Sequence, residues 1–293
     1  MRREKRIYAL GFFDGVHVGH QALLRACCEQ AQEHHCETAA ITFDAHPRSL
    51  FSAHAPLLIT SAADRQELLH RYGMEHIHCF PVAKEVMSTN WEVFLEQLLE
   101  QGAAGFVCGD DFHFGHRGEG NAENLRNFCA QRNLPCVIVP EQTLSGRRVS
   151  STLIRSLIEG GEMETATKFL GHPHILSGTV RHGQKLGRKL GVPTANLMIP
   201  AGVCVPKFGV YVCCAVIDGI HYPAVANVGI RPTVSGTGVT VEPWILDFSG
   251  DLYGKTICLE FYRFLRPEIK FDSLCALQQQ IQSDAQETRA YFQ

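Results

Sequence analysis

The chain has 293 residues, of which 45% are hydrophobic and 19% charged, with a formal net charge of −3. This length exceeds the ~100–200 residues of a typical single domain, so we expect two domains. The small net charge excludes a general attraction to nucleic acid or to an anionic membrane. Any phosphate binding should therefore be local.

Twelve cysteines are scattered along the chain and form no CxxC pair. Most lie within apolar runs, which favours buried free thiols in a reducing cytoplasm over a disulfide framework or a zinc site. The N-terminal residues lack the apolar segment of a signal peptide, and no apolar run reaches the ~18 residues of a membrane-spanning helix. We therefore expect a cytoplasmic protein.

In the first half, short apolar runs alternate with helical patterns. Strands are predicted at residues 7–10, 38–43, 76–80, 105–108 and 136–140. Helices are predicted near residues 20–34, 62–72, 91–101 and 122–131. This alternation predicts a parallel sheet covered on both faces, in which ligands bind outside the carboxyl ends of the strands.

The segment "GFFDGVHVGH", residues 11–20, lies between the first predicted strand and the first helix. Its glycine-flanked turn would direct backbone N–H groups and the positive end of the helix dipole to one place, which suits a phosphate. His17 and His20 are three residues apart and would share one side of the first helical turn. Taken alone, such a pair is most often a capping or packing pair.

Three more segments follow predicted strands: "TFDAHP", "CGDDFHFGHRGEG" and "SSTLIR". In the last, Ser150 or Ser151 can cap a helix and Arg155 adds charge, which makes a second phosphate clamp. The glycine-aromatic loop could alternatively be a structural Ω-loop, and "SSTLIR" an ordinary capped helix. Their shared position at one edge of the sheet favours a nucleotide site.

These four motifs, in this order, resemble the adenylyltransferase module of prokaryotic bifunctional FAD synthetases, which belong to the nucleotidyltransferase superfamily with an HxGH motif. "HVGH" matches that motif, and "SSTLIR" resembles the second phosphate-binding motif. The resemblance implies a Rossmann-like α/β domain with catalytic His17 and His20. The expected ATP- and phosphate-binding residues are Gly11, Asp14, Ser150, Ser151 and Arg155. On chemistry and position alone, Asp111 and Phe112 are candidate flavin contacts.

In the second half, short strand-like runs separated by close turns predict a small antiparallel barrel or sandwich. The runs are residues 178–181, 209–217, 221–228, 239–248 and 255–262. The chain should end in one amphipathic helix, capped by Asp272 or Ser273, with an apolar stripe of Leu274, Leu277, Ile281 and Ala285. We expect the domains to be residues 1–171 and 172–293.

The segment "GTVRHGQKLGRKLGVPTANL", residues 178–197, has neither the GK[ST] of a P-loop nor GxGxxG. Gly183 and Gly187 would let the backbone wrap an anion, and Lys185 adds charge. Thr194 and Asn196 offer two oxygen ligands on one face of an extended segment, a normal environment for Mg²⁺ beside nucleotide phosphates. The alternative is a glycine-rich hairpin with basic surface residues.

This segment, with "NVGIRPTV", "VEPWILDFSGDLYG" and "FLRPEIKF", closely resembles the riboflavin kinase module that follows the adenylyltransferase in the same family. The resemblance implies a six-stranded antiparallel barrel with a C-terminal helix. It assigns Glu242 as the catalytic base, Thr194 and Asn196 as Mg²⁺ ligands, and Arg266 to the flavin site. Composition alone leaves Asp247 and Asp251 as competing bases.

The activity implied by the resemblance has two steps. ATP would phosphorylate riboflavin to FMN in the C-terminal domain, leaving ADP. A second ATP would adenylylate FMN to FAD in the N-terminal domain, releasing pyrophosphate. Rival hypotheses are a single active half and a non-catalytic flavin or nucleotide sensor. No nucleic-acid or membrane partner is expected, and the oligomeric state stays open.

Four positions depart from the family pattern: Ala45, His172, Ala224 and Trp244. None of them removes a proposed catalytic group. Trp244 lies two residues from Glu242 and therefore bears on the fit of the kinase substrate.

Overall fold

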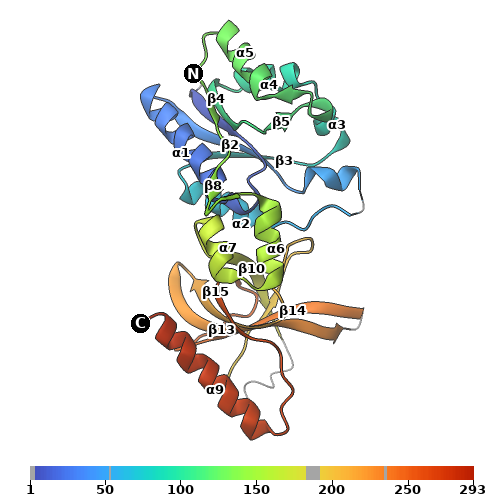
Figure 1. Cartoon of the computed structure of the whole chain (residues 1–293), viewed down its shortest axis with the longest axis vertical. Coiled ribbons are helices and arrows are strands. Elements are labelled where there is room, and N and C mark those ends of the chain that lie inside the picture. The colour runs from blue at the N-terminus through green and yellow to red at the C-terminus, as the bar shows by residue number, and fades with distance from the viewer. Residues whose placement is uncertain (1–3, 53, 183–191, 234–235) are drawn as a thin grey trace. The chain divides into compact units, whose positions relative to one another are not determined.

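The computed structural model describes residues 4–52, 54–182, 192–233 and 236–293 (Figure 1). Gly183, Lys185 and Gly187, expected at the ATP phosphates, lie outside the described residues. The chain divides into two compact units. The N-terminal unit is Met1–Leu58 with Ala62–Ser151, and the C-terminal unit is Ile59–Ser61 with Thr152–Gln293. The domain boundary expected after residue 171 stays a prediction.

The N-terminal unit contains a five-stranded parallel sheet of order β3-β2-β1-β4-β7. The strands are β1 (Arg6–Leu10), β2 (Glu37–Phe43), β3 (His76–Phe80), β4 (Ala103–Gly109) and β7 (Cys136–Val139). The chain moves outward from β1 to β3 and then restarts on the other side with β4. This order creates a switch point between β1 and β4, where ligands bind in open parallel sheets.

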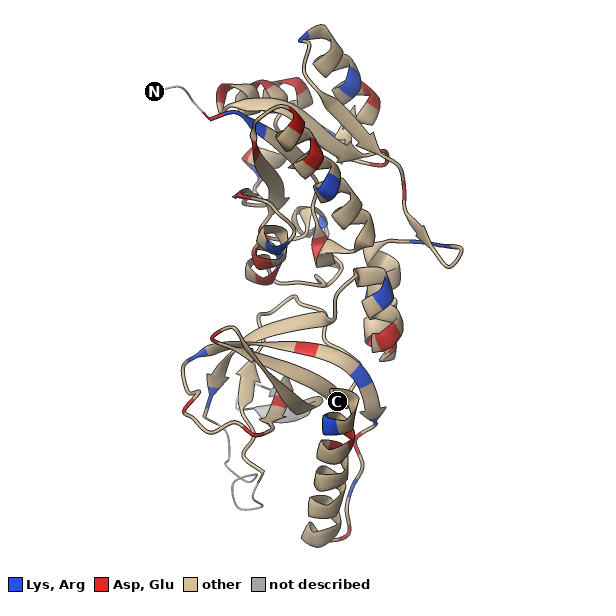
Figure 2. Cartoon of the chain, turned by 90° about the vertical axis from the view of Figure 1, so that its left-hand side faces the viewer, with Lys and Arg blue, Asp and Glu red and all other residues tan. Residues whose placement is uncertain are grey.

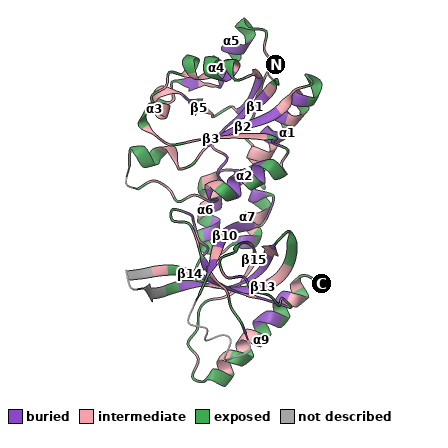
Figure 3. Ribbon diagram, turned by 180° about the vertical axis from the view of Figure 1, so that it is seen from behind, coloured by how far each residue is buried: buried purple, intermediate pink, exposed green. Residues whose placement is uncertain are grey.

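Among the described residues of this unit, the α-helices that follow the strands are α1 (Val18–Glu33), α2 (Ala62–Arg71), α3 (Lys84–Met87), α4 (Trp91–Glu100) and α5 (Ala122–Gln131). Helix α1 packs across the sheet, while α4 and α5 share a buried cluster with Tyr8 and Phe106 of the sheet. Figure 3 shows the buried strands between helices whose outer faces are exposed. The predicted helices are confirmed to within about two residues at each end, whereas the short α3 was not predicted.

Short elements connect these strands and helices. They are η1 (Asp14–Val16), η2 (Pro47–Leu50), β5 (His113–Phe114), η3 (His116–Gly118), β6 (Gly120–Asn121), β8 (Thr143–Leu144) and β9 (Arg147–Arg148). The glycine-aromatic loop thus contains the small β5–β6 hairpin. Helices α6 (Ser151–Gly160) and α7 (Met163–Leu170) follow β9.

The C-terminal unit contains a closed barrel of order β10-β11-β14-β13-β12-β15, so the sandwich alternative is wrong. Its antiparallel strands are β10 (His174–Arg181), β11 (Asn196–Met198), β12 (Gly209–Ile217), β13 (Ile220–Thr233), β14 (Gly236–Ile245) and β15 (Thr256–Arg266). Asp218 and Gly219, both at positive φ (50° and 80°), close the β12–β13 hairpin. Asp-Gly pairs favour this type of two-residue hairpin turn, because both residues tolerate positive φ.

Successive side chains of β12 point alternately into the barrel and toward its outer wall. Tyr211, Cys213 and Ala215 belong to the barrel core. Val210 points outward, where it packs with Val225, Leu246 and Ala285, the last from α9 (Leu274–Tyr291). The predicted final helix therefore covers part of the outer wall.

Helix α9 begins as predicted, because Ser273 Oγ accepts a hydrogen bond from Ala276 N–H at 3.2 Å. Ala285 is fully buried, but Leu274 is 66% exposed. Including Leu274 in the apolar stripe was wrong, because the first turn of α9 buries little of its surface.

All twelve cysteines are free thiols, as predicted. Within the described residues, no helix is long and apolar enough to cross a membrane. Acidic and basic side chains are interspersed over the described parts of both units (Figure 2).

Candidate active sites

The turn after β1 has an unusual backbone. Phe13 and Val16 have φ of 58° and 39°, and Gly15 has φ of 77°. Left-handed φ in residues other than glycine costs about 1–3 kcal/mol each and concentrates at functional sites. The neighbouring strand supports the turn, since Thr42 Oγ1 donates to the Phe12 carbonyl at 2.7 Å. The turn therefore fixes where α1 begins.

His17 and His20 meet at the N-terminus of α1, as the sequence predicted. His17 is the N-cap, and its Nδ1 accepts the His20 backbone N–H at 3.2 Å. The neutral His17 ring therefore carries its proton on Nε2. The two rings stack with centroids 3.6 Å apart and planes 10° apart. A Cβ on Gly19 would lie 3.2 Å from His17 Nδ1, so glycine at this position keeps the ring unobstructed.

Burial lowers the pKa of His20 well below its ordinary value, and electrostatic interactions with His17 and Arg65 lower it further. The ring is therefore neutral near pH 7 and can donate one hydrogen bond. Among the described residues, Nδ1 of His20 has no hydrogen-bond partner. His20 thus keeps hydrogen-bonding capacity for a ligand.

Arg65, on α2, is a buried cation that the sequence analysis missed. It is 0% exposed, its guanidinium donates to the Phe43 carbonyl, and it lies 4.7 Å from the centre of the Phe12 ring. Its Nε and Nη1 have no hydrogen-bond partner in the described part of the chain. Burial lowers the pKa of Arg65, while the charge of Asp14 opposes this shift. A buried positive charge beside this turn favours an anionic ligand.

A polar cavity of about 250 Å³ opens beside this turn. The predicted site residues that line it are Gly11, His17, His20, Asp111, Phe112, Ser150 and Ser151. Asp14 is buried next to it, and its carbonyl accepts a hydrogen bond from Ser151 Oγ at 3.2 Å. Arg155 lies one turn further along α6, in the part of that helix assigned to the C-terminal unit. Backbone N–H groups, hydroxyls and imidazoles thus meet around one space.

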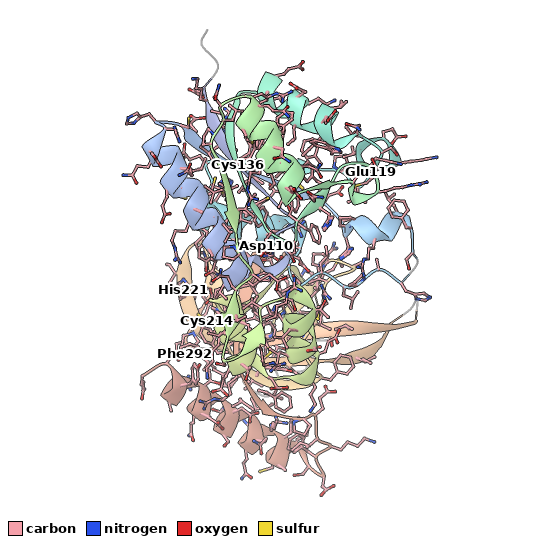
Figure 4. The ribbon with its side chains drawn as sticks, turned by 45° about the horizontal axis from the view of Figure 1, so that its top comes forward. Asp110, Glu119, Cys136, Cys214, His221 and Phe292 are labelled. Carbon is pink, nitrogen blue, oxygen red and sulfur yellow. The ribbon has the colours of Figure 1, made fainter. Side chains whose placement is uncertain are left out.

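The carboxylates that line this cavity are Asp110 and Asp111, which follow β4, and Glu141, which follows β7. Arg148 pairs with Asp111 at 2.6 Å and with Glu141 at 2.5 Å. Asp110, labelled in Figure 4, accepts the Glu141 backbone N–H at 3.2 Å. Because Arg148 offsets two of these charges, the cavity remains compatible with a phosphate.

An apolar cavity of about 290 Å³ shares Leu10, Gly11, Phe12 and Phe112 with the polar cavity. The rings of Phe112 and Phe114 stack on its wall with centroids 5.5 Å apart. A flat aromatic group joined to a phosphate could therefore occupy both cavities. Phe112 lies between them, whereas Asp111 lines only the polar one.

The C-terminal unit has its own cavity, of about 370 Å³, on the outer wall of the barrel. It is lined by Val192, Thr194, Val210, Val225, Asn227, Glu242, Trp244, Arg266, Glu268, Ile269, Phe271, Leu277, Ile281 and Asp284. Strand β14 pairs Glu242 with Asn227, and the Leu197–Val241 and Thr194–Trp244 pairs place Asn196 opposite Glu242. Since Leu197 and Val241 face the core, Thr194, Asn196 and Glu242 share the outward face.

The three candidate bases lie in different surroundings. Glu242 is 9% exposed and lines the cavity. Asp247 is exposed and pairs with Arg289 at 3.0 Å, while exposed Asp251 accepts the Tyr253 N–H at 3.0 Å. Neither aspartate lines the cavity. The geometry therefore favours Glu242 over both.

Two further carboxylates line the cavity and were not predicted. Glu268 accepts a hydrogen bond from Asn227 Nδ2 at 2.9 Å. The carboxylate of Asp284, on α9, accepts hydrogen bonds from the Arg266 guanidinium, the shortest of which is 2.7 Å. The same carboxylate also accepts a hydrogen bond from Gln280 Nε2 at 2.9 Å. Arg266 is thus in the predicted cavity, with its orientation fixed by a buried ion pair.

The family departures lie in different places. Trp244 forms part of the cavity wall beside Glu242. Ala224 is buried in the barrel core. His172 is also buried, and its Nδ1 lies 2.7 Å from the Pro173 carbonyl oxygen. Ala45 is half-buried in the segment after β2. Only Trp244 of these four lines a cavity described above.

Comparison with known proteins gives matches over both units. Residues 1–153 match the FAD synthetase family, and residues 170–292 match the riboflavin kinase family. A bifunctional riboflavin kinase/FMN adenylyltransferase of Listeria monocytogenes is 34% identical, covering 98% of this chain and 92% of that protein. A protein of the same description from Pseudomonas fluorescens is 35% identical, and the match covers 99% of this chain and 94% of that protein.

A crystal structure from Streptococcus pneumoniae has the same architecture, with a TM-score of 0.87 and 32% identity. The alignment covers 99% of this chain and 95% of that one, which is described as a macrolide-efflux protein. The two family matches together cover most of the chain, and both relatives match it over nearly its full length. The chain therefore belongs to the bifunctional riboflavin kinase/FMN adenylyltransferase family.

Proposed function

We propose that this chain makes FAD from riboflavin in two steps. The C-terminal unit phosphorylates riboflavin to FMN with ATP and releases ADP. The N-terminal unit then adenylylates FMN with a second ATP and releases pyrophosphate. The observation that carries this proposal is the pairing of each family match with a cavity of suitable chemistry: imidazoles and hydroxyls in one, a buried carboxylate in the other.

In the kinase step, the nucleophile is the primary hydroxyl of the riboflavin side chain. A neutral hydroxyl attacks the γ-phosphorus of ATP poorly, so a carboxylate that accepts its proton accelerates the reaction. Glu242 takes this role, and its burial keeps the carboxylate out of bulk water. Arg266, oriented by Asp284, would lie beside the flavin.

Kinases and nucleotidyltransferases that use ATP generally need a divalent metal ion. Thr194 and Asn196 fit Mg²⁺, because they offer neutral oxygen donors on the same face as Glu242. The ion would neutralise charge on the ATP phosphate oxygens. Gly183, Lys185 and Gly187 would bind the same phosphates, on the strength of the sequence motif.

In the adenylyl-transfer step, the FMN phosphate is already an anion, and it attacks the α-phosphorus while pyrophosphate leaves. The main task is to stabilise negative charge, which preorganised donors do well. Neutral His20 donates a hydrogen bond, as does Nε2–H of His17. Gly11, Ser150 and Ser151 line the cavity and add donors, and the Asp14 carbonyl accepts a hydrogen bond from Ser151 Oγ. Buried Arg65 adds positive charge beside the turn, and Arg155 would add more, on the strength of the sequence motif.

The flavin ring of FMN would occupy the apolar cavity, against Phe112. We also propose that the boundary between the two catalytic domains lies at residues 171–172. The twelve free thiols support a location in the reducing cytoplasm.

Incubation of the purified chain with riboflavin, ATP and Mg²⁺, followed by chromatography, tests the function. We expect FMN to appear first and FAD to follow, with one ADP and one pyrophosphate per FAD. Accumulation of FMN alone would remove the second activity. Flavin binding without any product would favour the sensor hypothesis.

A further inference from the structure

The outer wall of the barrel carries a cysteine, a histidine and a glutamate whose ligand atoms all lie within 4.8 Å of one another: Cys214, His221 and Glu260. They come from the adjacent strands β12, β13 and β15. Cys214 pairs directly with Glu260, and His221 lies two positions from Pro223, the partner of Cys214 on β13. Figure 4 shows Cys214 and His221 next to each other.

We propose that these three side chains form a site for a divalent transition-metal ion, with Zn²⁺ as the best match and water as the fourth ligand. Thiolate, imidazole and carboxylate are the usual zinc ligands, and three protein ligands leave one position open. The site is separate from the kinase cavity, because none of the three residues lines that cavity.

The distances fit such an ion. In a tetrahedral site, a Zn–S bond of about 2.3 Å and Zn–N and Zn–O bonds of about 2.1 Å place sulfur about 3.6 Å from nitrogen and nitrogen about 3.4 Å from oxygen. Cys214 Sγ lies 3.6 Å from His221 Nδ1, and His221 Nδ1 lies 3.7 Å from Glu260 Oε2. These two separations lie within a few tenths of an ångström of the ideal values, and the Cys214 sulfur lies within 4.8 Å of a Glu260 carboxylate oxygen.

Burial supports the same conclusion. Glu260 is only 4% exposed, and in the described part of the chain its carboxylate accepts one hydrogen bond, from Tyr262 Oη at 2.8 Å. A buried carboxylate needs a pairing cation or a metal. The His221 side chain is 59% exposed and leaves the site open to solvent. The Tyr262 hydroxyl acts as the supporting group that holds a ligating carboxylate.

The sequence disfavoured a zinc site because it contains no CxxC spacing. The ligands instead lie at positions 214, 221 and 260, and only the pairing of three strands brings them together. A bound ion would link β13, β12 and β15 where Tyr262 packs against Phe292 at the end of the chain, with ring centroids 5.1 Å apart. Metal binding should therefore stabilise the barrel.

Titration of the EDTA-stripped full chain with Co²⁺ alone tests the site. We expect one Co²⁺ per chain, a thiolate-to-cobalt charge-transfer band and a tetrahedral visible spectrum, both removed by added Zn²⁺. Cys214→Ser should abolish the charge-transfer band, whereas Cys275→Ser, at an exposed cysteine of α9, should leave it unchanged. Tyr262→Phe should weaken Co²⁺ binding by about 10–100-fold.

The variant His221→Gln covers the case in which Cys214→Ser does not fold, because His221 is exposed. It should weaken Co²⁺ binding by more than Tyr262→Phe does. A wild-type titration without a thiolate band, or a band of equal strength in Cys214→Ser, would overturn the proposal. Binding of Co²⁺ at the ATP site cannot mimic the result, since Thr194 and Asn196 offer only oxygen ligands.

Discussion

The polar cavity of the N-terminal unit and the cavity of the C-terminal unit, which we propose to be the two phosphoryl-transfer sites, are lined by different chemical groups. The first gathers His17, His20 and a helix N-terminus at the carboxyl end of a parallel sheet. The second places buried Glu242 on the outer wall of an antiparallel barrel. The difference follows the nucleophile: an FMN phosphate is already charged, whereas a riboflavin hydroxyl must lose a proton. Under the proposed function, the first cavity would stabilise negative charge, whereas the second would also remove a proton.

The strongest test of this contrast is Glu242→Gln, which keeps the shape of the side chain and removes its basicity. Loss of a general base should slow riboflavin phosphorylation by about 10²–10⁴-fold. ADP release with saturating riboflavin and ATP measures this step. Asp247→Asn is the matched control and should change the rate little, because Asp247 pairs with Arg289 outside the cavity. An equal loss in both variants would remove Glu242 from the role of base.

In the cavity of the N-terminal unit, His20→Ala removes a hydrogen-bond donor but no general base. We expect pyrophosphate release from FMN and ATP to fall by about 10²–10³-fold, by analogy with the loss of one oxyanion-hole donor. His35→Ala, at an exposed histidine after α1, should keep the wild-type rate. If His20→Ala retained nearly full activity, the imidazole pair would be structural only.

Each unit also contains a buried neutral histidine, which makes stability sensitive to acid. In the barrel, burial and, to a smaller extent, the neighbouring His172 lower the pKa of His174 to about 3. The unfolded chain binds this proton near pH 6.5, so the stabilisation is complete above that pH and is lost as the pH falls toward 3. Between pH 7.5 and 5.0 the expected loss is about 2 kcal/mol.

Urea unfolding at pH 7.5 and pH 5.0 measures how much the free energy of unfolding falls on acidification. His174→Leu should reduce the loss on acidification by that amount, while His34→Leu, at an exposed histidine, should leave it as in the wild type. An unchanged pH dependence in His174→Leu would contradict the assignment.

The smallest expected effect concerns substrate fit. Trp244→Ala removes one aromatic side chain from the wall of the kinase cavity. Such contacts are worth about 0.5–1.5 kcal/mol, so KM for riboflavin should rise about 2–10-fold with little change in kcat. Adenylyl transfer from supplied FMN should not change. A large fall in kcat instead would mean that Trp244 positions Glu242.

The sequence predicts helices, strands and caps well where they depend on residues that are close together in the chain. The end of β1, the His17–His20 pair and the Ser273 cap depend on residues that are neighbours in the chain. Arg65 could not be predicted as buried, because its burial depends on the packing of α2 against the turn after β1.

The kinase cavity shows the same limit. Glu242 is recognisable from its motif, whereas Asp284 looks like any polar residue of an exposed helix face. Its position beside Arg266 depends on how α9 packs on the barrel. The Cys214, His221 and Glu260 cluster likewise depends on strand register, which spacing in the sequence does not reveal.

The most direct test of the two-site account is a chromatographic product profile of His20→Ala and Glu242→Gln, each supplied with ATP and either riboflavin or FMN. The account predicts that His20→Ala converts riboflavin to FMN and stops there. It predicts that Glu242→Gln leaves riboflavin unchanged but converts FMN to FAD at the wild-type rate. Loss of both steps from either single substitution, in a folded protein, would contradict it.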